Sequence, residues 1–152
     1  MRSAWIFAGA LGMVLAPRSL DGQQSRWQRQ VQAHLERASA KLLADGYTPL
    51  HAARDGQLDN EEVEPDTITF AAGWSYVLLG ACDDDCGGLE LGLFAANGYE
   101  VDAARRAGNA PIVRVTPRET QRYRFTVRMT GCGMNPCWYA VRAFRRPVGR
   151  RP

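Results

Sequence analysis

Residues 73–94 read GWSYVLLGACDDDCGGLELGLF, and this stretch predicts more of the fold than any other part of the chain. Its first half alternates Tyr76 and Leu78 with Val77 and Leu79, so both faces of the predicted strand are apolar. A strand of this kind is expected in the middle of a sheet, because an edge position would leave apolar surface in water.

The second half of the stretch has the pattern of a strand with one wet face. Leu89, Leu91 and Leu93 point to one side, and Glu90 points to the other. Because only a short loop separates the two strands, we expect them to pair antiparallel. The aspartates Asp83–Asp85 in this loop repel one another, so the loop should face solvent or a cation.

The chain has 152 residues, of which 45% are hydrophobic and 23% charged, a composition typical of one globular domain. Residues 1–22 carry Arg2 and then an apolar run that ends at Ala16, which is the pattern of an export signal peptide. The run is shorter than the roughly 20 residues that a membrane span needs. An uncleaved N-terminal anchor, which would hold the protein at a membrane surface, is the alternative.

Four cysteines occur as two close pairs, C-x3-C at Cys82 and Cys86 and C-x4-C at Cys132 and Cys137. In an exported chain they are expected to form disulfides. Three pairings are possible, and we favour the two local ones because each pair flanks a loop between consecutive predicted strands. A zinc site built from all four cysteines is the alternative, although neither spacing is the usual C-x2-C.

One amphipathic helix is predicted within residues 23–46. Ser25 and Gln28 form a capping-box pattern at its start, and Gly46 is the expected stop. We expect its apolar stripe to dock on the rest of the domain. The residues of this stripe are Trp27, Val31, Leu35, Ala38 and Leu42.

The remaining chain predicts short strands without helices between them. Residues 47–66 are rich in turn formers and acids and are expected to form a solvated connector, and the pair Asn97-Gly98 predicts a hairpin. Residues 122–129 alternate arginine and threonine with apolar side chains, and residues 147–152 are expected to form a loose basic tail. Residues 47–146 therefore predict a jelly-roll-like antiparallel β-sandwich of about seven or eight strands.

Positive charge is concentrated near the C-terminus. Residues 105–152 contain twelve arginines and one acid, a net charge of +11 in a chain whose formal charge is +3. Arginines on neighbouring predicted strands would form a basic face that attracts polyanions such as surface polysaccharide or lipid headgroups. Aromatic residues are not interleaved on this face, which disfavours nucleic acid as a partner. Its candidate residues are Arg114, Arg122, Arg124, Arg128 and Arg142.

Six segments, over roughly residues 56–146, occur in a familiar order. They are DGQL at 55–58, TITFAAGWSYVLLG at 67–80, CDDDCGGLELGLF at 82–94, ANGYEV at 96–101, PIVRVTPRETQRYRFTVRM at 111–129, and C-x4-C-W-Y-A-V at 132–141. This order resembles the bacterial pre-peptidase C-terminal domains, which are exported β-sandwiches of jelly-roll type. The resemblance implies a non-catalytic module that aids export, solubility or substrate adhesion, with calcium bound in some members.

The acidic loop is the candidate metal site. A calcium ion takes about six to eight oxygen ligands, and carboxylates are among those it prefers. Asp83, Asp84, Asp85 and Glu90 are the residues from which the chain would supply them.

The chain carries no catalytic signature that we can identify. GWSYV lacks the second glycine of a nucleophile elbow, and neither His34 nor His51 lies in an H-E-x-x-H motif. We therefore expect a periplasmic or extracellular binding or structural module whose partner is a cell-surface or extracellular polymer, or another exported protein. The alternative is a small secreted hydrolase with carboxylate or metal chemistry, which would need carboxylates converging in a pocket.

Overall fold

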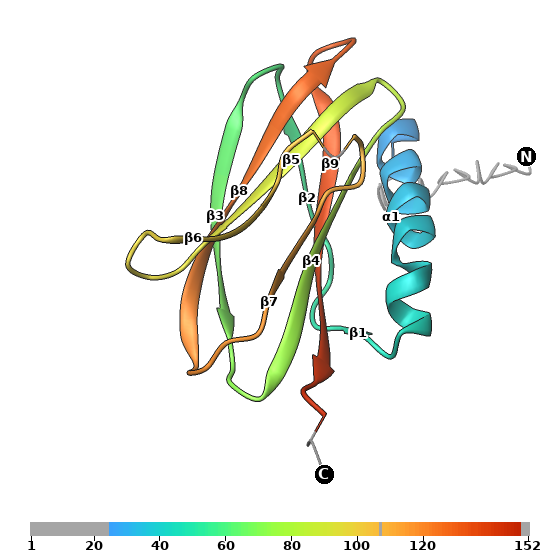
Figure 1. The fold of residues 1–152 in the computed structure, drawn as a ribbon. Helices are drawn as coiled ribbons and strands as arrows, with labels where there is room; N and C mark the ends of the chain where they lie inside the picture. Colours follow the sequence, from blue (N-terminus) through green and yellow to red (C-terminus); the bar gives the residue numbers. More distant parts are fainter. Residues whose placement is uncertain (1–24, 107, 150–152) are drawn as a thin grey trace, which may run out of the picture.

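The structure is a computed structural model that describes residues 25–106 and 108–149. The predicted signal peptide, residues 1–22, lies outside the described residues. The described chain forms one helix and nine strands, and Figure 1 shows the helix on one side of two layers of strands. The elements are α1 (Arg26–Ala44), β1 (Thr48–Pro49), β2 (Arg54–Leu58), β3 (Val63–Phe70), β4 (Trp74–Cys82), β5 (Cys86–Phe94), β6 (Glu100–Ala104), β7 (Ile112–Val115), β8 (Gln121–Cys132) and β9 (Cys137–Pro147).

The strands form two antiparallel sheets with jelly-roll connectivity. The first sheet has the order β1-β9-β4-β7, with β2 also paired to β9, and the second has the order β3-β8-β5-β6. The pairs β2·β9, β3·β8, β4·β7 and β5·β6 are nested, so the chain from β2 to β5 runs antiparallel to the chain from β6 to β9. This doubled chain, folded into two layers, is a jelly roll, and the predicted fold class is confirmed.

Strand β4 lies in the interior of its sheet, as its two apolar faces predict. It is paired with β9 on one side and β7 on the other. Tyr76 and Leu78 point into the core between the sheets, where they pack with inward side chains of β3, β5 and β8. Val77 and Leu79 point to the outer face, and both are fully buried. A second layer must therefore cover the outside of this sheet.

Helix α1 is that layer. Val31, Leu35 and Leu42 pack on the outer face of β4 and β9, against a cluster that includes Val77, Leu79, Ala81, Ala140 and Phe144. The predicted capping box is present, because the Gln28 N–H lies 3.2 Å from Ser25 Oγ and the Ser25 N–H lies 2.9 Å from Gln28 Oε1. The docking of the stripe is confirmed for these residues. Trp27 is the exception, because it is only half-buried and lies outside the buried cluster.

Strands β4 and β5 do not pair, and the predicted hairpin between them is wrong. Both edges of β4 are already occupied by β7 and β9, so the chain crosses through the acidic loop to the other sheet. There β5 pairs with β8 and β6. The hairpin predicted at Asn97-Gly98 is confirmed, since it connects β5 to β6 and Gly98 has a φ of +85°.

The predicted connector, residues 47–66, contains more structure than expected. Strand β2 lies within it and pairs with β9 from Arg54↔Val141 to Leu58↔Cys137. Only Leu58 of this strand is buried, so β2 lacks the apolar alternation by which a strand is recognised. Strand β9 runs to Pro147, so it includes the first residue of the predicted basic tail. Residues 150–152 lie outside the described residues.

The burial of α1 on the sheet gives a direct test of this packing. Leu35 is 1% exposed, so Leu35→Ala should lower the free energy of unfolding by about 2–5 kcal/mol because it leaves a cavity under the helix. Leu43 lies on the same helix and is 48% exposed, so Leu43→Ala is the matched control and should change the free energy of unfolding little. Urea unfolding followed by circular dichroism measures both, and an equal loss in the two variants would contradict the packing.

Candidate functional site

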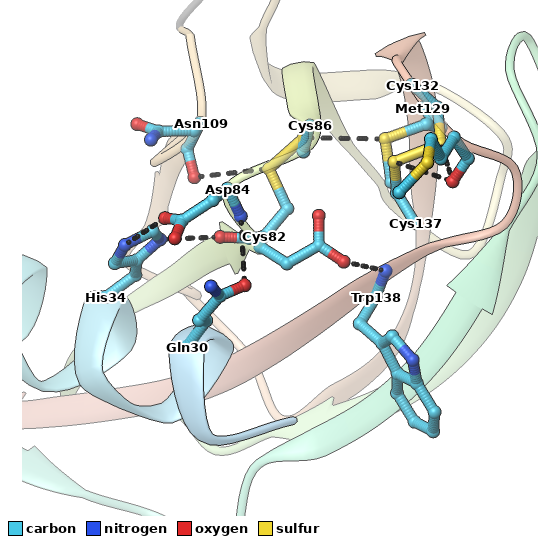
Figure 2. The surroundings of a disulfide bond; sticks show 12 residues. Gln30, His34, Cys82, Asp84, Cys86, Asn109, Met129, Cys132, Cys137 and Trp138 are labelled. Carbon is cyan, nitrogen blue, oxygen red and sulfur yellow. Dashed lines mark hydrogen bonds and ion pairs between the residues drawn. A yellow bond between two sulfur atoms is a disulfide. The ribbon is translucent and has the colours of Figure 1, made fainter. Parts of the chain in front are cut away.

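Two disulfides lie next to each other at one end of the sandwich (Figure 2). Cys82–Cys86 has an S–S distance of 2.04 Å, and Cys132–Cys137 has one of 2.08 Å. Cys86 and Cys132 are directly paired across β5 and β8. The two local pairings are confirmed, and the zinc alternative is wrong because no cysteine is free. Two disulfides indicate that the protein folds in an oxidising environment.

Each disulfide closes a loop that crosses between the two sheets. The loop between β4 and β5 spans Asp83–Asp85, and the loop between β8 and β9 spans residues 133–136. The Gly133 N–H donates to the Asp85 carbonyl at 2.8 Å, so the two crossings support each other. This end of the molecule is therefore fixed by covalent and hydrogen bonds together.

The three aspartates of the acidic loop have different surroundings. Asp83 is only 2% exposed, against the expectation that it would face solvent or a cation. It is held by the backbone of Trp138. The Trp138 backbone N–H donates to Asp83 Oδ2 at 2.7 Å, and the Trp138 carbonyl accepts the Asp83 backbone N–H at 3.1 Å. Burial raises the pKa of the Asp83 carboxyl, against the opposing effect of the Trp138 N–H. Asp83 Oδ1 is buried and has no hydrogen-bond partner within the described part of the chain.

Asp84 points toward α1 (Figure 2). The ring of His34 bridges the loop to the helix, with Nδ1 2.7 Å from the Cys82 carbonyl and Nε2 3.2 Å from Asp84 Oδ1. The Asp84 N–H also lies 3.5 Å from Gln30 Oε1. These contacts fasten the first half of the helix to the disulfide-closed loop.

The candidate calcium ligands are divided among separate partners. Glu90 lies on β5, where its carboxylate is 3.8 Å from the Arg128 guanidinium and accepts the Arg106 N–H at 3.3 Å. In the part of the chain that the structure describes, no three acidic, histidine or cysteine side chains are grouped as metal ligands. Calcium binding by Asp83, Asp84, Asp85 and Glu90 stays a prediction that this geometry does not favour.

The five candidate arginines do not form one basic face. Arg122, Arg124 and Arg128 lie on β8 in the second sheet, whereas Arg114 and Arg142 lie on β7 and β9 in the first. The prediction of a shared face is wrong because β8 belongs to one sheet, whereas β7 and β9, which precede and follow it in the sequence, belong to the other. Several of these side chains are also engaged: Arg124 lies 4.5 Å from the Phe94 ring centroid, and Arg128 forms an ion pair with Glu61.

A groove runs along the flank of α1 where the helix leaves the edge of the first sheet uncovered. The register Gln57↔Trp138 and Asp55↔Ala140 places the side chains of Gln57 and Asp55 on the same outer face as Trp138. Trp138 lines both a hollow of about 340 Å³ and a smaller one of about 130 Å³. We call the two together the tryptophan groove. The larger hollow is lined by Trp27, Gln57, Asp83, Asp85, Met134, Asn135, Pro136 and Trp138, and the smaller by Gln28, Val31, Gln32, Asp55, Trp138 and Tyr139.

The lining of the tryptophan groove combines rings with hydrogen-bonding side chains. Trp27 and Trp138 are half-buried, so part of each indole is accessible. Gln57 and Asn135 add amides, Asp85 adds a half-exposed carboxylate, and Met134 next to them is 62% exposed. A concave site with aromatic walls and a few polar groups is suited to a small ligand or a polymer chain.

Sequence reasoning missed most of this groove. Trp27 has the spacing of the helix stripe and was expected to be core, and Trp138 has the alternation of an ordinary strand residue. Gln57 lies on the strand that the sequence did not reveal. Only Asp83 and Asp85 were candidate site residues beforehand, as calcium ligands. No local pattern connects α1, β2 and the two disulfide loops, which meet only in the folded chain.

The contact between Asp83 and Trp138 can be tested by mutation. Asp83→Ala should destabilise the protein by about 1–3 kcal/mol, because it leaves the Trp138 N–H without an acceptor. Asp84→Ala removes the neighbouring, exposed carboxylate and should cost less than about 1 kcal/mol. Thermal and urea unfolding measure both. A stability loss in Asp84→Ala as large as that in Asp83→Ala would contradict a stabilising role of the Asp83–Trp138 hydrogen bond.

No protein-family model and no curated protein matches the sequence. The residues that the structure describes include no helix with the length and hydropathy of a membrane span.

Proposed function

We propose that the protein is an exported, non-catalytic binding module that holds a glycan chain of the cell surface or extracellular space in the tryptophan groove. The observation that carries this proposal is the pair of accessible tryptophans, Trp27 and Trp138, in the wall of one hollow. The resemblance to pre-peptidase C-terminal domains supports the same kind of function, since it implies adhesion rather than catalysis.

The chemistry of the groove suits a sugar chain. The apolar C–H faces of pyranose rings stack on indole rings, which present a large rigid surface at low cost in conformational entropy. Gln57, Asn135 and Asp85 offer donors and acceptors for the hydroxyl groups at the ring edges. The smaller hollow beyond Trp138 adds Gln28, Gln32 and Asp55, which would extend contact to further units of a chain.

Two features support export. The first residues have the pattern of a signal peptide, and the two disulfides require an oxidising compartment such as the periplasm or the extracellular space. An exported module with a fixed disulfide-closed end is suited to contact polymers outside the cell.

The hydrolase alternative has one observation in its favour, because Asp83 and Asp85 line the same hollow. A glycosidase needs one carboxyl that can pass a proton to the leaving oxygen. Asp83 is 2% exposed, and its Oδ2 already accepts the Trp138 N–H, so it has no path to a substrate oxygen. The arrangement therefore favours binding without bond cleavage.

Titration calorimetry with soluble hexasaccharides tests the proposal. The probes are the β-1,4-linked hexamers of glucose, glucosamine and N-acetylglucosamine, and at least one of them should bind without being cleaved. Trp138→Ala should weaken that binding by about tenfold or more, because it removes one stacking surface. Trp74→Ala, at the opposite end of β4, is the matched control and should bind like the parent. Absence of binding by all three probes, or equal affinity in both variants, would contradict the proposal.

A further inference from the structure

The charged side chains that line the tryptophan groove all have the same sign. Asp83 and Asp85 line the larger hollow and Asp55 lines the smaller, and among the described residues neither lining includes a lysine or an arginine. This is notable in a chain with 19 basic and 16 acidic residues. Such a groove repels glycans that carry carboxylate, sulfate or phosphate groups, and it attracts cations.

One of these negative charges, that of Asp83, is buried in the wall of the larger hollow. The residue is 98% buried, and in the described part of the chain no basic side chain forms an ion pair with its carboxylate. Its Oδ1 accepts no hydrogen bond from any residue that the structure describes. A buried carboxylate without a cation is unfavourable, and its field is weakly screened because little water surrounds it. A ligand that brings positive charge into the hollow would offset that cost.

The tryptophans of the groove are compatible with a cationic ligand. Indole is the best of the aromatic side chains at holding a cation over its face. Trp27 already does so on one side, where the Arg26 guanidinium lies 5.0 Å from the ring centroid. Trp138 lines both hollows, and among residues 25–106 and 108–149 no cation lies over its ring.

From these observations we propose that the ligand of the tryptophan groove is an amine-bearing glycan, a chain that contains glucosamine units with free ammonium groups. This inference rests on the proposed function and deepens it. Asp85, which is half-exposed, contacts the ammonium groups directly, while buried Asp83 contributes through its field. The indole faces and the amides of Gln57 and Asn135 bind the sugar rings that carry the amines.

The test compares two hexamers that differ only at carbon 2 of each unit, with ammonium in β-1,4-glucosamine and hydroxyl in β-1,4-glucose. Titration calorimetry of the full mature chain at low salt should show at least about tenfold tighter binding of the glucosamine hexamer. Asp85→Asn removes the charge but keeps a hydrogen-bonding side chain of similar size, so it should remove most of that preference and change the affinity for the glucose hexamer much less than the affinity for the glucosamine hexamer. Asp45→Asn, an exposed aspartate that caps the other end of α1, is the matched control and should keep the preference.

The outcomes separate this inference from the proposed function. Equal affinity for the two hexamers, with Trp138→Ala weakening both, would overturn the amine preference and leave glycan binding intact. Binding of neither hexamer would overturn the amine preference, and the proposed function would fall with it if the N-acetylglucosamine hexamer also failed to bind. If a hexapeptide of lysine binds as tightly as the glucosamine hexamer, the groove selects ligands by positive charge alone. That result would overturn the assignment of a glycan.

Discussion

The burial of both faces of β4 is the constraint on which the rest of the structure depends. Its inner side chains require a second sheet, and Val77, Leu79 and Ala81 on the outer side require another cover. Burying a valine or leucine side chain contributes about 1.5–3 kcal/mol, so neither face can be left in water without a large loss of stability. The jelly roll satisfies the first requirement, and α1 satisfies the second. The helix is therefore an integral layer of the domain.

The position of α1 also creates the groove. The helix covers β4 and β9 but leaves β2 at the edge of the sheet, so Trp138 and Gln57 stay accessible beside it. His34 fastens the helix to the loop between Cys82 and Cys86, and the Asp83–Trp138 contact fastens that loop to β9. The second disulfide fixes the neighbouring loop. The walls of the groove thus come from four parts of the chain, and these few specific contacts fix their relative positions.

The sequence predicts the features that depend on local pattern. The capping box, the helix stripe, the hairpin at Asn97-Gly98 and the alternation of β8 all follow from residues close together in the chain, and the structure contains each of them. The failures involve long-range choices. Strands β4 and β5 were expected to pair because they are consecutive. In the structure β4 instead pairs with β7 on one side and β9 on the other. Strand β2 was missed because an edge strand with one buried side chain has no apolar period.

The same distinction explains the candidate sites. The arginines were grouped by their closeness in sequence, yet the crossings between sheets separate β7 and β9 from β8. The aspartates were taken as one cluster, yet a backbone N–H of β9 draws Asp83 inward while Asp84 faces α1. Trp27 and Trp138, 111 residues apart in the chain, meet at one hollow only because the helix docks where β9 begins. Such a site cannot be predicted without the topology.

Amide hydrogen exchange of the full chain, read by mass spectrometry, tests most directly whether α1 and β4 form one cooperative unit. The account predicts that amides of residues 31–42 exchange as slowly as those of residues 76–81, because the helix opens only when the sheet beneath it loses its packing. Rapid exchange throughout the helix, with the sheet still protected, would contradict the account and would remove one wall of the groove.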